Sequence, residues 1–109
     1  MALSKYRIMW LFVMFDLPVD STESRREYAR FRKQLLTKGF SMLQYSVYAK
    51  HLPSEEAAEP LKSHVKAHLP PRGHVRVVAI TDMQFSKMES YFGKKRKPVE
   101  DPPLQISLF

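Results

Sequence analysis

The chain has 109 residues, no cysteine and a formal net charge of +7. This length suits one compact domain that keeps much of its surface available for association. Without cysteine, disulfides, zinc knuckles and thiol nucleophiles are excluded. The excess of basic residues favours a polyanionic partner, with nucleic acid ahead of an anionic membrane surface.

The first predicted element is an apolar run, residues 8–15, that ends on Asp16. Eight apolar residues are too few to span a membrane as a helix, and they favour a β-strand buried on both faces. Strand alternation places Asp16 with the even-numbered residues on one face. The N-terminal segment resembles a signal peptide only weakly, because no small-residue cleavage site follows the apolar run. We therefore expect a mature cytoplasmic protein with no membrane partner.

A basic amphipathic helix is predicted next. Ser21 or Thr22 supplies the N-cap, and Gly39 follows the expected last turn. Arg25 and Arg26 lie on the charged side, where they are either a solvated surface or contacts to a polyanion. The apolar stripe consists of Tyr28, Phe31, Leu35 and Leu36.

Residues 40–52 favour β-structure, and their pattern alone predicts one long strand. A second helix is expected to begin near Ser54, or near Glu59 if Pro60 lies in its first turn, and to stop before Pro70. The pattern does not choose between these two starts.

A well-buried strand is predicted at residues 74–81. Asp82 can cap a short helical turn that contains Phe85, and residues 91–92 form a brief strand before Gly93. Strands that alternate with helices indicate an α+β domain, with one mixed sheet and helices on one face. The first strand then needs a cover on its second face, which a twin subunit supplies.

Residues 94–109 are predicted to be an appendage to a domain formed by residues 1–93. The basic run Lys94, Lys95, Arg96 and Lys97 is either a chance match to a nuclear localisation signal or an exposed turn that grips phosphates. The end of the chain alternates like an edge strand that needs a sheet to join. Its docking residues are Leu104, Ile106, Leu108 and Phe109.

Asp16 is the strongest candidate for chemistry. One interpretation is that it caps the turn into Leu17 and Pro18, as Asp often does after a strand. The other is that its carboxylate, at the end of a buried strand, holds a hard divalent cation such as Mg²⁺, which needs only one or two protein carboxylates. A twofold axis nearby would bring two copies of Asp16 to one ion.

Other candidates are weaker. His64 and His68 have helical spacing, but they lack the glutamate of the zinc-protease motif and an obvious third ligand. Ser41 and Ser46 have no base in a recognisable arrangement. The aromatic residues fall on stripes that look buried, so we expect binding to a duplex through its shape and backbone rather than stacking on single strands.

Several features occur together in one order: an apolar strand that ends on Asp16, an Arg-rich helix, Gly39 before the motif of residues 44–48, and the passage of residues 70–77. This combination resembles the second CRISPR-associated protein family, the small dimeric proteins of the spacer-acquisition machinery. The likeness is greatest to members from type II systems, which use a single large effector nuclease.

The resemblance implies a ferredoxin-like β-α-β-β-α-β fold in which residues 40–52 form two strands broken near residues 44–46. It implies a homodimer whose sheets face each other, with the odd-numbered face of the first strand on its own helices and the even-numbered face toward the twin. It further implies that Asp16 is the catalytic and metal-binding residue, with two copies around one magnesium ion.

Two functions follow from this resemblance. The family is described as a metal-dependent endonuclease on RNA or DNA, and as a scaffold that bridges dimers of the integrase, the first CRISPR-associated protein, on double-stranded DNA. In the scaffold, Arg25, Arg26 and residues 94–97 contact the DNA backbone, and residues 104–109 dock on the twin or the integrase. We expect the scaffold to be the biological role, with nuclease activity conditional and single-stranded RNA a further substrate.

Overall fold

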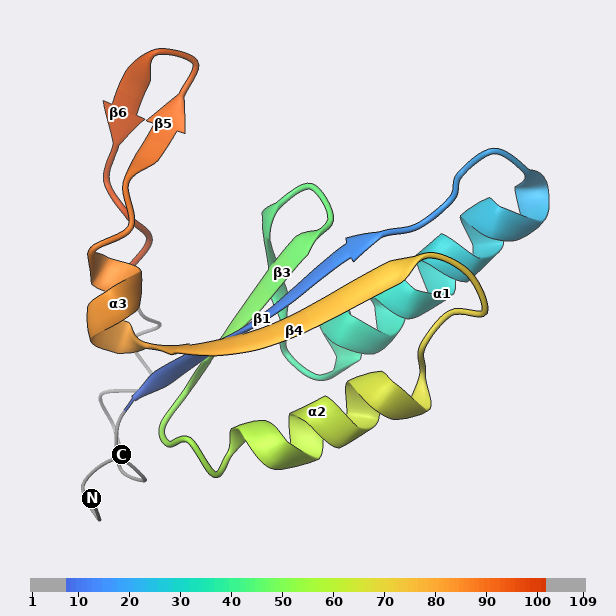
Figure 1. The fold of residues 1–109 in the computed structure, drawn as a ribbon, viewed down its shortest axis with the longest axis horizontal. Helices are drawn as coiled ribbons and strands as arrows, with labels where there is room; N and C mark the ends of the chain where they lie inside the picture. The colour runs from blue at the N-terminus through green and yellow to red at the C-terminus, as the bar shows by residue number, and fades with distance from the viewer. Residues whose placement is uncertain (1–7, 102–109) are drawn as a thin grey trace.

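The structure is a computed structural model that describes residues 8–101. The predicted docking strand of residues 104–109 lies outside the described residues. Within residues 8–101, nine elements follow one another (Figure 1): β1 (Met9–Asp16), α1 (Thr22–Thr37), β2 (Ser41–Gln44), β3 (Val47–Leu52), α2 (Ala58–Ala67), β4 (His74–Thr81), α3 (Asp82–Ser86), β5 (Ser90–Phe92) and β6 (Lys95–Lys97).

The main sheet has the order β2-β3-β1-β4, and all neighbouring strands are antiparallel. This order confirms the predicted α+β, ferredoxin-like fold, but the mixed sheet that the residue pattern predicts is wrong, because every pairing in the sheet is antiparallel. The single long strand at residues 40–52 is wrong, because Tyr45 and Ser46 form a tight turn between β2 and β3. Ser46 has a φ of 63°, a conformation usual in hairpin turns but uncommon outside glycine and asparagine.

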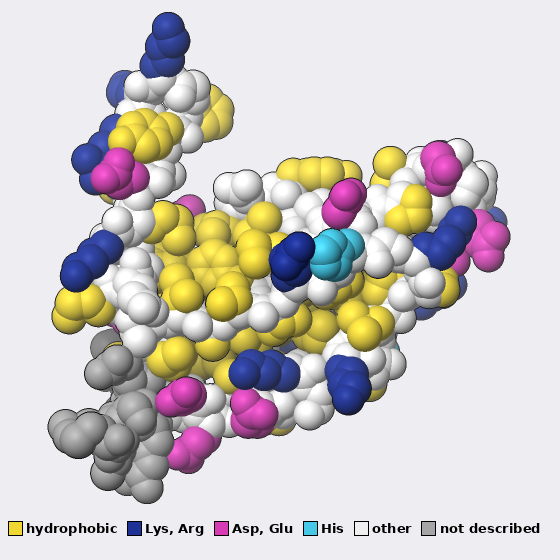
Figure 2. All heavy atoms as spheres, viewed as in Figure 1, with side chains coloured by type: hydrophobic (Ala, Val, Ile, Leu, Met, Phe, Trp, Pro, Cys, Tyr) yellow, Lys and Arg dark blue, Asp and Glu magenta, His cyan; other side chains and the backbone are white. Residues whose placement is uncertain are grey.

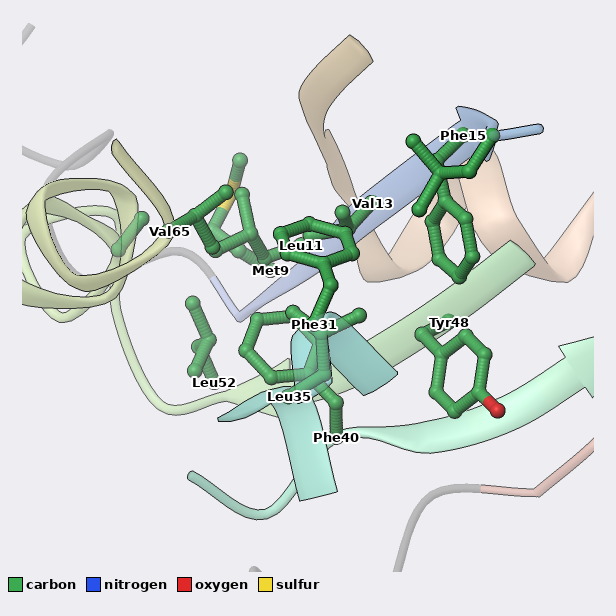
Figure 3. Close-up of a cluster of buried hydrophobic side chains, with 12 residues drawn as sticks. Met9, Leu11, Val13, Phe15, Phe31, Leu35, Phe40, Tyr48, Leu52 and Val65 are labelled. Atoms are coloured by element: carbon green, nitrogen blue, oxygen red, sulfur yellow. The ribbon is translucent and has the colours of Figure 1, made fainter. Parts of the chain in front are cut away.

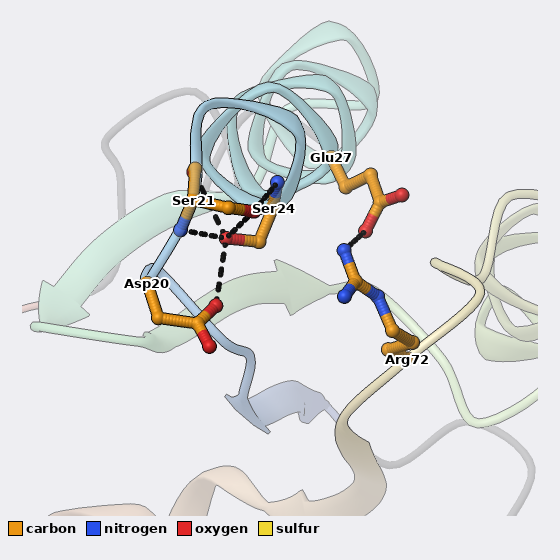
Figure 4. A network of polar contacts seen from close by, with 5 residues as sticks. All are labelled: Asp20, Ser21, Ser24, Glu27 and Arg72. Carbon is orange, nitrogen blue, oxygen red and sulfur yellow. Dashed lines mark hydrogen bonds and ion pairs between the residues drawn. The ribbon is translucent and has the colours of Figure 1, made fainter.

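Helix α1 begins and ends as predicted. Ser21 is the N-cap, and its Oγ accepts a 3.0 Å hydrogen bond from the backbone N–H of Ser24. The Ser24 hydroxyl in turn accepts from the N–H of Ser21 and donates to Asp20 (Figure 4). At the other end, Gly39 has a φ of 86°, which ends the helix.

Helix α2 begins at Ala58, later than a start near Ser54 and close to the alternative at Glu59. Pro60 therefore lies in the first turn, where its missing N–H leaves no hydrogen bond unmade. The Ser54 hydroxyl instead accepts a 3.3 Å hydrogen bond from the N–H of Ala57 just before the helix.

The main core lies between the odd-numbered face of β1 and helices α1 and α2 (Figure 3). Leu11 and Val13 are fully buried there, against Phe31 and Leu35 of α1 and Val65 of α2. The predicted packing of the odd-numbered face against the chain's own helices is therefore confirmed.

The even-numbered face of β1 is covered at one end by α3. The rings of Trp10 and Phe85 stack with centroids 3.9 Å apart, and the Trp10 indole N–H donates a 2.8 Å hydrogen bond to Asp82. Asp82 is thus held by Trp10, and Thr81 is the N-cap of α3 in its place. The expectation that a twin subunit must supply the cover is wrong for Trp10 and Phe12, which α3 and Val99 bury within the chain.

The rest of this face stays open. Strand β4 is at the edge of the sheet, and Val78 remains 42% exposed, so the expectation that residues 74–81 are well buried is wrong for a single chain. Figure 2 shows hydrophobic side chains gathered on the viewed face beside α3, with basic and histidine side chains next to them. Among residues 8–101, no helix is long and apolar enough to cross a membrane.

The basic run near the C-terminus is part of a β-hairpin rather than a simple turn. Strand β6 pairs with β5, so that Tyr91 lies opposite Arg96 and Phe92 opposite Lys95. This hairpin extends away from the main sheet (Figure 1).

Candidate functional site

The pairing of β1 with β4 determines which side chains lie near Asp16. The two strands are antiparallel, so the end of β1 meets the start of β4, and Asp16 lies opposite His74. Met14 lies opposite Arg76. Because alternate residues of a strand share a face, Asp16, His74 and Arg76 lie together on the even-numbered face.

These residues line a shallow hollow of about 250 Å³ at the open edge of the sheet. The turn between β2 and β3 forms its other wall, held to β1 by a 3.0 Å hydrogen bond from the N–H of Phe15 to the carbonyl of Ser46. One acidic, one basic, one imidazole and two hydroxyl side chains therefore converge on one site. The lining residues are Met14, Phe15, Asp16, Tyr45, Ser46, Val47, His74 and Arg76.

Gly73 allows this close approach. Its φ is 101°, and a Cβ added there would lie 2.7 Å from the carbonyl oxygen of Asp16 and 2.6 Å from the Leu17 side chain. No side chain fits between these backbones, so glycine brings the start of β4 against the end of β1.

The loop before Gly73 is anchored to α1. Arg72 donates a 3.0 Å hydrogen bond to the carboxylate of Glu27 (Figure 4). This hydrogen bond is the main reason that the pKa of Arg72 is raised, and the negative charge of Glu27 raises it further. The ion pair holds the loop in position at the entrance to β4.

Asp16 is exposed, and no side chain among residues 8–101 gives its carboxylate a hydrogen bond or an ion pair. The interpretation in which Asp16 caps the following turn therefore has no hydrogen bond to support it in the described chain. Within residues 8–101, no group of three or more His, Cys, Asp or Glu side chains could hold a metal ion. At this hollow, one chain thus offers a single carboxylate, that of Asp16, to a cation.

Tyr45 is 71% exposed beside Asp16, contrary to the expectation that the aromatic residues lie on buried stripes. Its ring stacks on that of Tyr28, with centroids 6.0 Å apart. Hydrogen bonding with the Tyr28 side chain, and then the like charge of that phenol, raises the pKa of Tyr45.

The remaining histidines do not join this site. His51 is buried under Trp10, with its Nε2 3.4 Å from Asp82. The rings of His64 and His68 pack together at the end of α2. One ring nitrogen of each histidine faces a backbone carbonyl. The pKa of His64 is lowered, and burial of the ring is the largest cause.

The predicted nucleic-acid contacts fall into two separate groups. Arg25 and Arg26 are exposed near the start of α1, and the Arg25 guanidinium folds back to donate a 3.2 Å hydrogen bond to the carbonyl of Val19. Residues 94–97 lie on the distant hairpin, where the Lys97 Nζ is 4.9 Å from the centre of the Phe92 ring. Within one chain the two groups lie at opposite ends of the molecule (Figure 1).

Comparison with known proteins decides the family. The family model described as "CRISPR associated protein Cas2" matches residues 9–88, most of the chain. The chain belongs to the Cas2 family. The resemblance to this family found in the sequence is thereby confirmed, while the likeness to members from type II systems stays a prediction.

Three relatives carry the name "CRISPR-associated endoribonuclease Cas2". The one from Parvibaculum lavamentivorans is 50% identical over 93% of this chain and 100% of its own length. The relative from Flavobacterium psychrophilum is 41% identical over 98% of this chain and 93% of its own length. The relative from Ligilactobacillus salivarius is 40% identical over 85% of this chain and 92% of its own length.

Sequence reasoning finds Asp16 but misses four of its neighbours in this Cas2 chain. The pattern places His74 and Arg76 in a buried strand and Tyr45 in a long one, and it gives Ser46 no catalytic partner. In a ferredoxin-like sheet the first and last strands are antiparallel neighbours, so residues 74–76 can be placed opposite residues 14–16 once that fold is assumed. Nothing in the sequence indicates that the Tyr45 side chain is exposed.

We predict that Gly73→Ala lowers the free energy of unfolding by more than about 2 kcal/mol, because the new side chain adds a clash to an unfavourable φ. Gly93→Ala is the matched control: its φ is 65°, but nothing lies within 4 Å of the added Cβ. It should cost no more than about 1–2 kcal/mol. Urea unfolding measures both, and equal losses would contradict the close approach at Asp16.

Proposed function

We propose that this Cas2 chain is a metal-assisted nuclease whose active site is completed by a homodimer and centred on Asp16. The observation that carries the proposal is the hollow in which Asp16, His74 and Arg76 share one face of the β1–β4 pair. A carboxylate for a cation, a base for a proton and a guanidinium for a phosphate are the groups that phosphodiester hydrolysis needs.

The donor set at Asp16 fits Mg²⁺. Its carboxylate is exposed and has no partner among residues 8–101, which leaves both oxygens available. Mg²⁺ keeps several waters and takes one or two protein carboxylates, so a single Asp16 from each of two chains meets this need. When bound, the ion supplies an activated water and neutralises charge on the phosphate.

The other residues of the hollow perform the remaining steps. Arg76 can pair its guanidinium with a non-bridging phosphate oxygen, which orients the scissile bond. His74, directly across from Asp16, can accept the proton of the attacking water and return it to the leaving oxygen. The three side chains thus divide the work of cation binding, phosphate binding and proton transfer.

The open sheet face supports the homodimer. Met14 and Val47 of the hollow are half-buried, and Val78, further along β4 on the same face, is 42% exposed, so apolar side chains on this face stay partly uncovered in one chain. A second copy packed on this face by a twofold axis would bury the apolar side chains and bring the two Asp16 residues near one another.

RNA is the substrate we propose first, because the relatives at 50% and 41% identity are named endoribonucleases. The hydrolysis described above makes no use of a 2′-hydroxyl, so DNA is chemically acceptable to the same groups. RNA and DNA cleavage should therefore be measured side by side.

Asp16→Asn should abolish Mg²⁺-dependent cleavage, because the amide keeps the shape of the side chain but removes its charge. Glu56→Gln, an exposed acidic residue outside the hollow, is the matched control and should cleave like the parent. Cleavage of labelled RNA and DNA with Mg²⁺ or with a chelator measures this. Undiminished cleavage by purified Asp16→Asn would rule out the assignment.

A second function, the scaffold that bridges integrase dimers on duplex DNA, is favoured by the hairpin. All side chains of β6 are exposed and basic, which suits contact with a phosphate backbone. In a dimer, two hairpins and two copies of Arg25 and Arg26 would give four basic patches. Docking of Leu104, Ile106, Leu108 and Phe109 on the twin or the integrase belongs to this proposal.

Reversing charge in Lys95→Glu with Arg96→Glu should weaken duplex binding and reduce its salt dependence. The slope of log affinity against log salt should fall by about 0.9 for each phosphate that the variant no longer neutralises. Lys66→Glu on α2 is the matched control, since it is equally exposed but far along the chain from the hairpin. An unchanged slope in the double variant, measured by fluorescence anisotropy, would contradict the role of the hairpin in duplex binding.

A further inference from the structure

Two histidines lie one turn apart at the end of α2. His64 and His68 have i, i+4 spacing, so their side chains leave the same side of the helix, and their ring centroids are 4.3 Å apart. Helix α2 packs on the odd-numbered face of the sheet, opposite the face on which we place the second copy. The nuclease and the scaffold proposed above make no use of this pair.

The contacts of the two rings determine which ring nitrogens carry a proton. The His64 Nε2 lies 3.3 Å from the carbonyl oxygen of Gln34, and the His68 Nδ1 lies 2.8 Å from the carbonyl oxygen of His64. A carbonyl can only accept a hydrogen bond, so each of these nitrogens donates an N–H. In a neutral imidazole the other nitrogen then has a lone pair, which makes the His64 Nδ1 and the His68 Nε2 the potential ligands.

Metal-binding histidines in proteins are held in the same way. A histidine that binds a metal ion almost always donates its other ring N–H to a carbonyl, a carboxylate or water, which fixes the tautomer and orients the ring. Both rings of the pair have such a partner, and both partners are backbone carbonyls. Two nitrogens that bind one tetrahedral ion at roughly 2 Å lie about 3.3 Å apart, so rings with centroids 4.3 Å apart are close enough to share one ion.

The surroundings of His64 favour the neutral imidazole that a metal ion requires. Burial of the ring is the largest cause of the lowered pKa of His64, and the charges of His68 and Lys38 lower it further. The hydrogen bond to the Gln34 carbonyl acts in the opposite direction and is outweighed. The pair also lies at the C-terminal end of α2, where the negative end of the helix dipole favours a cation.

We propose that His64 and His68 together bind one divalent transition-metal ion, such as Zn²⁺ or Ni²⁺, through the His64 Nδ1 and the His68 Nε2. Imidazole nitrogen suits these ions, whereas Mg²⁺ takes oxygen ligands. No third His, Cys, Asp or Glu joins the pair among residues 8–101, so water fills the other positions of the ion. This site is separate from the magnesium site proposed at Asp16 and does not depend on it.

A bound ion would hold the end of α2 in place. His64 belongs to the helix and His68 follows its last residue, so an ion joined to both rings crosses the end of the helix. The loop that follows leads to Arg72 and Gly73, which position the start of β4 beside Asp16. An ion that binds the folded chain raises its free energy of unfolding.

Isothermal titration calorimetry with Zn²⁺, Ni²⁺ and Mg²⁺ tests the proposal on the full chain without a polyhistidine tag. The background is Asp16→Asn, so that an ion at the proposed magnesium site does not contribute. One Zn²⁺ or Ni²⁺ should bind for each chain, and Mg²⁺ should not compete. His64→Gln and His68→Gln should each weaken binding by more than about 10-fold, because even a residue that only orients a metal ligand contributes about 10- to 100-fold.

Two controls distinguish loss of a ligand from loss of the fold. Lys66→Gln changes an exposed side chain in the same turn of α2 and should bind Zn²⁺ like the Asp16→Asn background. The far-ultraviolet circular dichroism of His64→Gln and His68→Gln without metal should match that background, since His64 is half-buried and His68 is exposed. In urea unfolding, Zn²⁺ should raise the free energy of unfolding of the background but not that of either histidine variant.

Nuclear magnetic resonance of the imidazole nitrogens tests the assignment atom by atom. Addition of Zn²⁺ should shift the ¹⁵N resonances of the His64 Nδ1 and the His68 Nε2, while the other nitrogen of each ring stays protonated. The proposal would be overturned by Zn²⁺ binding that survives either histidine variant, by Mg²⁺ binding as tightly as Zn²⁺, or by ligation through the His64 Nε2 or the His68 Nδ1. Failure of the proposed nuclease is a separate result, because cleavage by Asp16→Asn would show it.

Discussion

The antiparallel pairing of β1 with β4 is the constraint on which the site depends. It places the end of the first strand beside the start of the last one, so Asp16 meets His74 although the two are far apart in sequence. Gly73 permits the approach, and the Arg72–Glu27 ion pair holds the loop that leads to it. A one-residue slip of β4 would turn His74 and Arg76 to the helix side of the sheet.

The two faces of β1 serve different purposes. The odd-numbered face carries most of the buried apolar side chains and ties the sheet to α1 and α2. The even-numbered face is closed only where α3 packs Phe85 on Trp10, and toward Asp16 it becomes open and polar. The odd-numbered face is thus packed along the whole strand, and on the even-numbered face the end at Asp16 stays open in a single chain.

Much of this architecture could be predicted from the sequence. The apolar run before Asp16, the Ser21 cap and Gly39 follow from local rules, and the structure agrees with each. The residue pattern alone does not show the break at Tyr45–Ser46, because the turn contains no glycine, proline or asparagine and is held by a hydrogen bond to β1; only the family resemblance implied it. The short helical turn with Phe85 was predicted, but its packing over Trp10 was not, because a five-residue helix leaves almost no periodic pattern to show which face it buries.

The central claim is that Asp16 from two chains forms one cation site. Titration of the purified protein with Mn²⁺, which takes the same oxygen ligands as Mg²⁺ and is visible by electron paramagnetic resonance, tests it directly. The account predicts one bound Mn²⁺ for every two chains and loss of that binding in Asp16→Asn. One Mn²⁺ for each chain, or binding that survives the substitution, would contradict it.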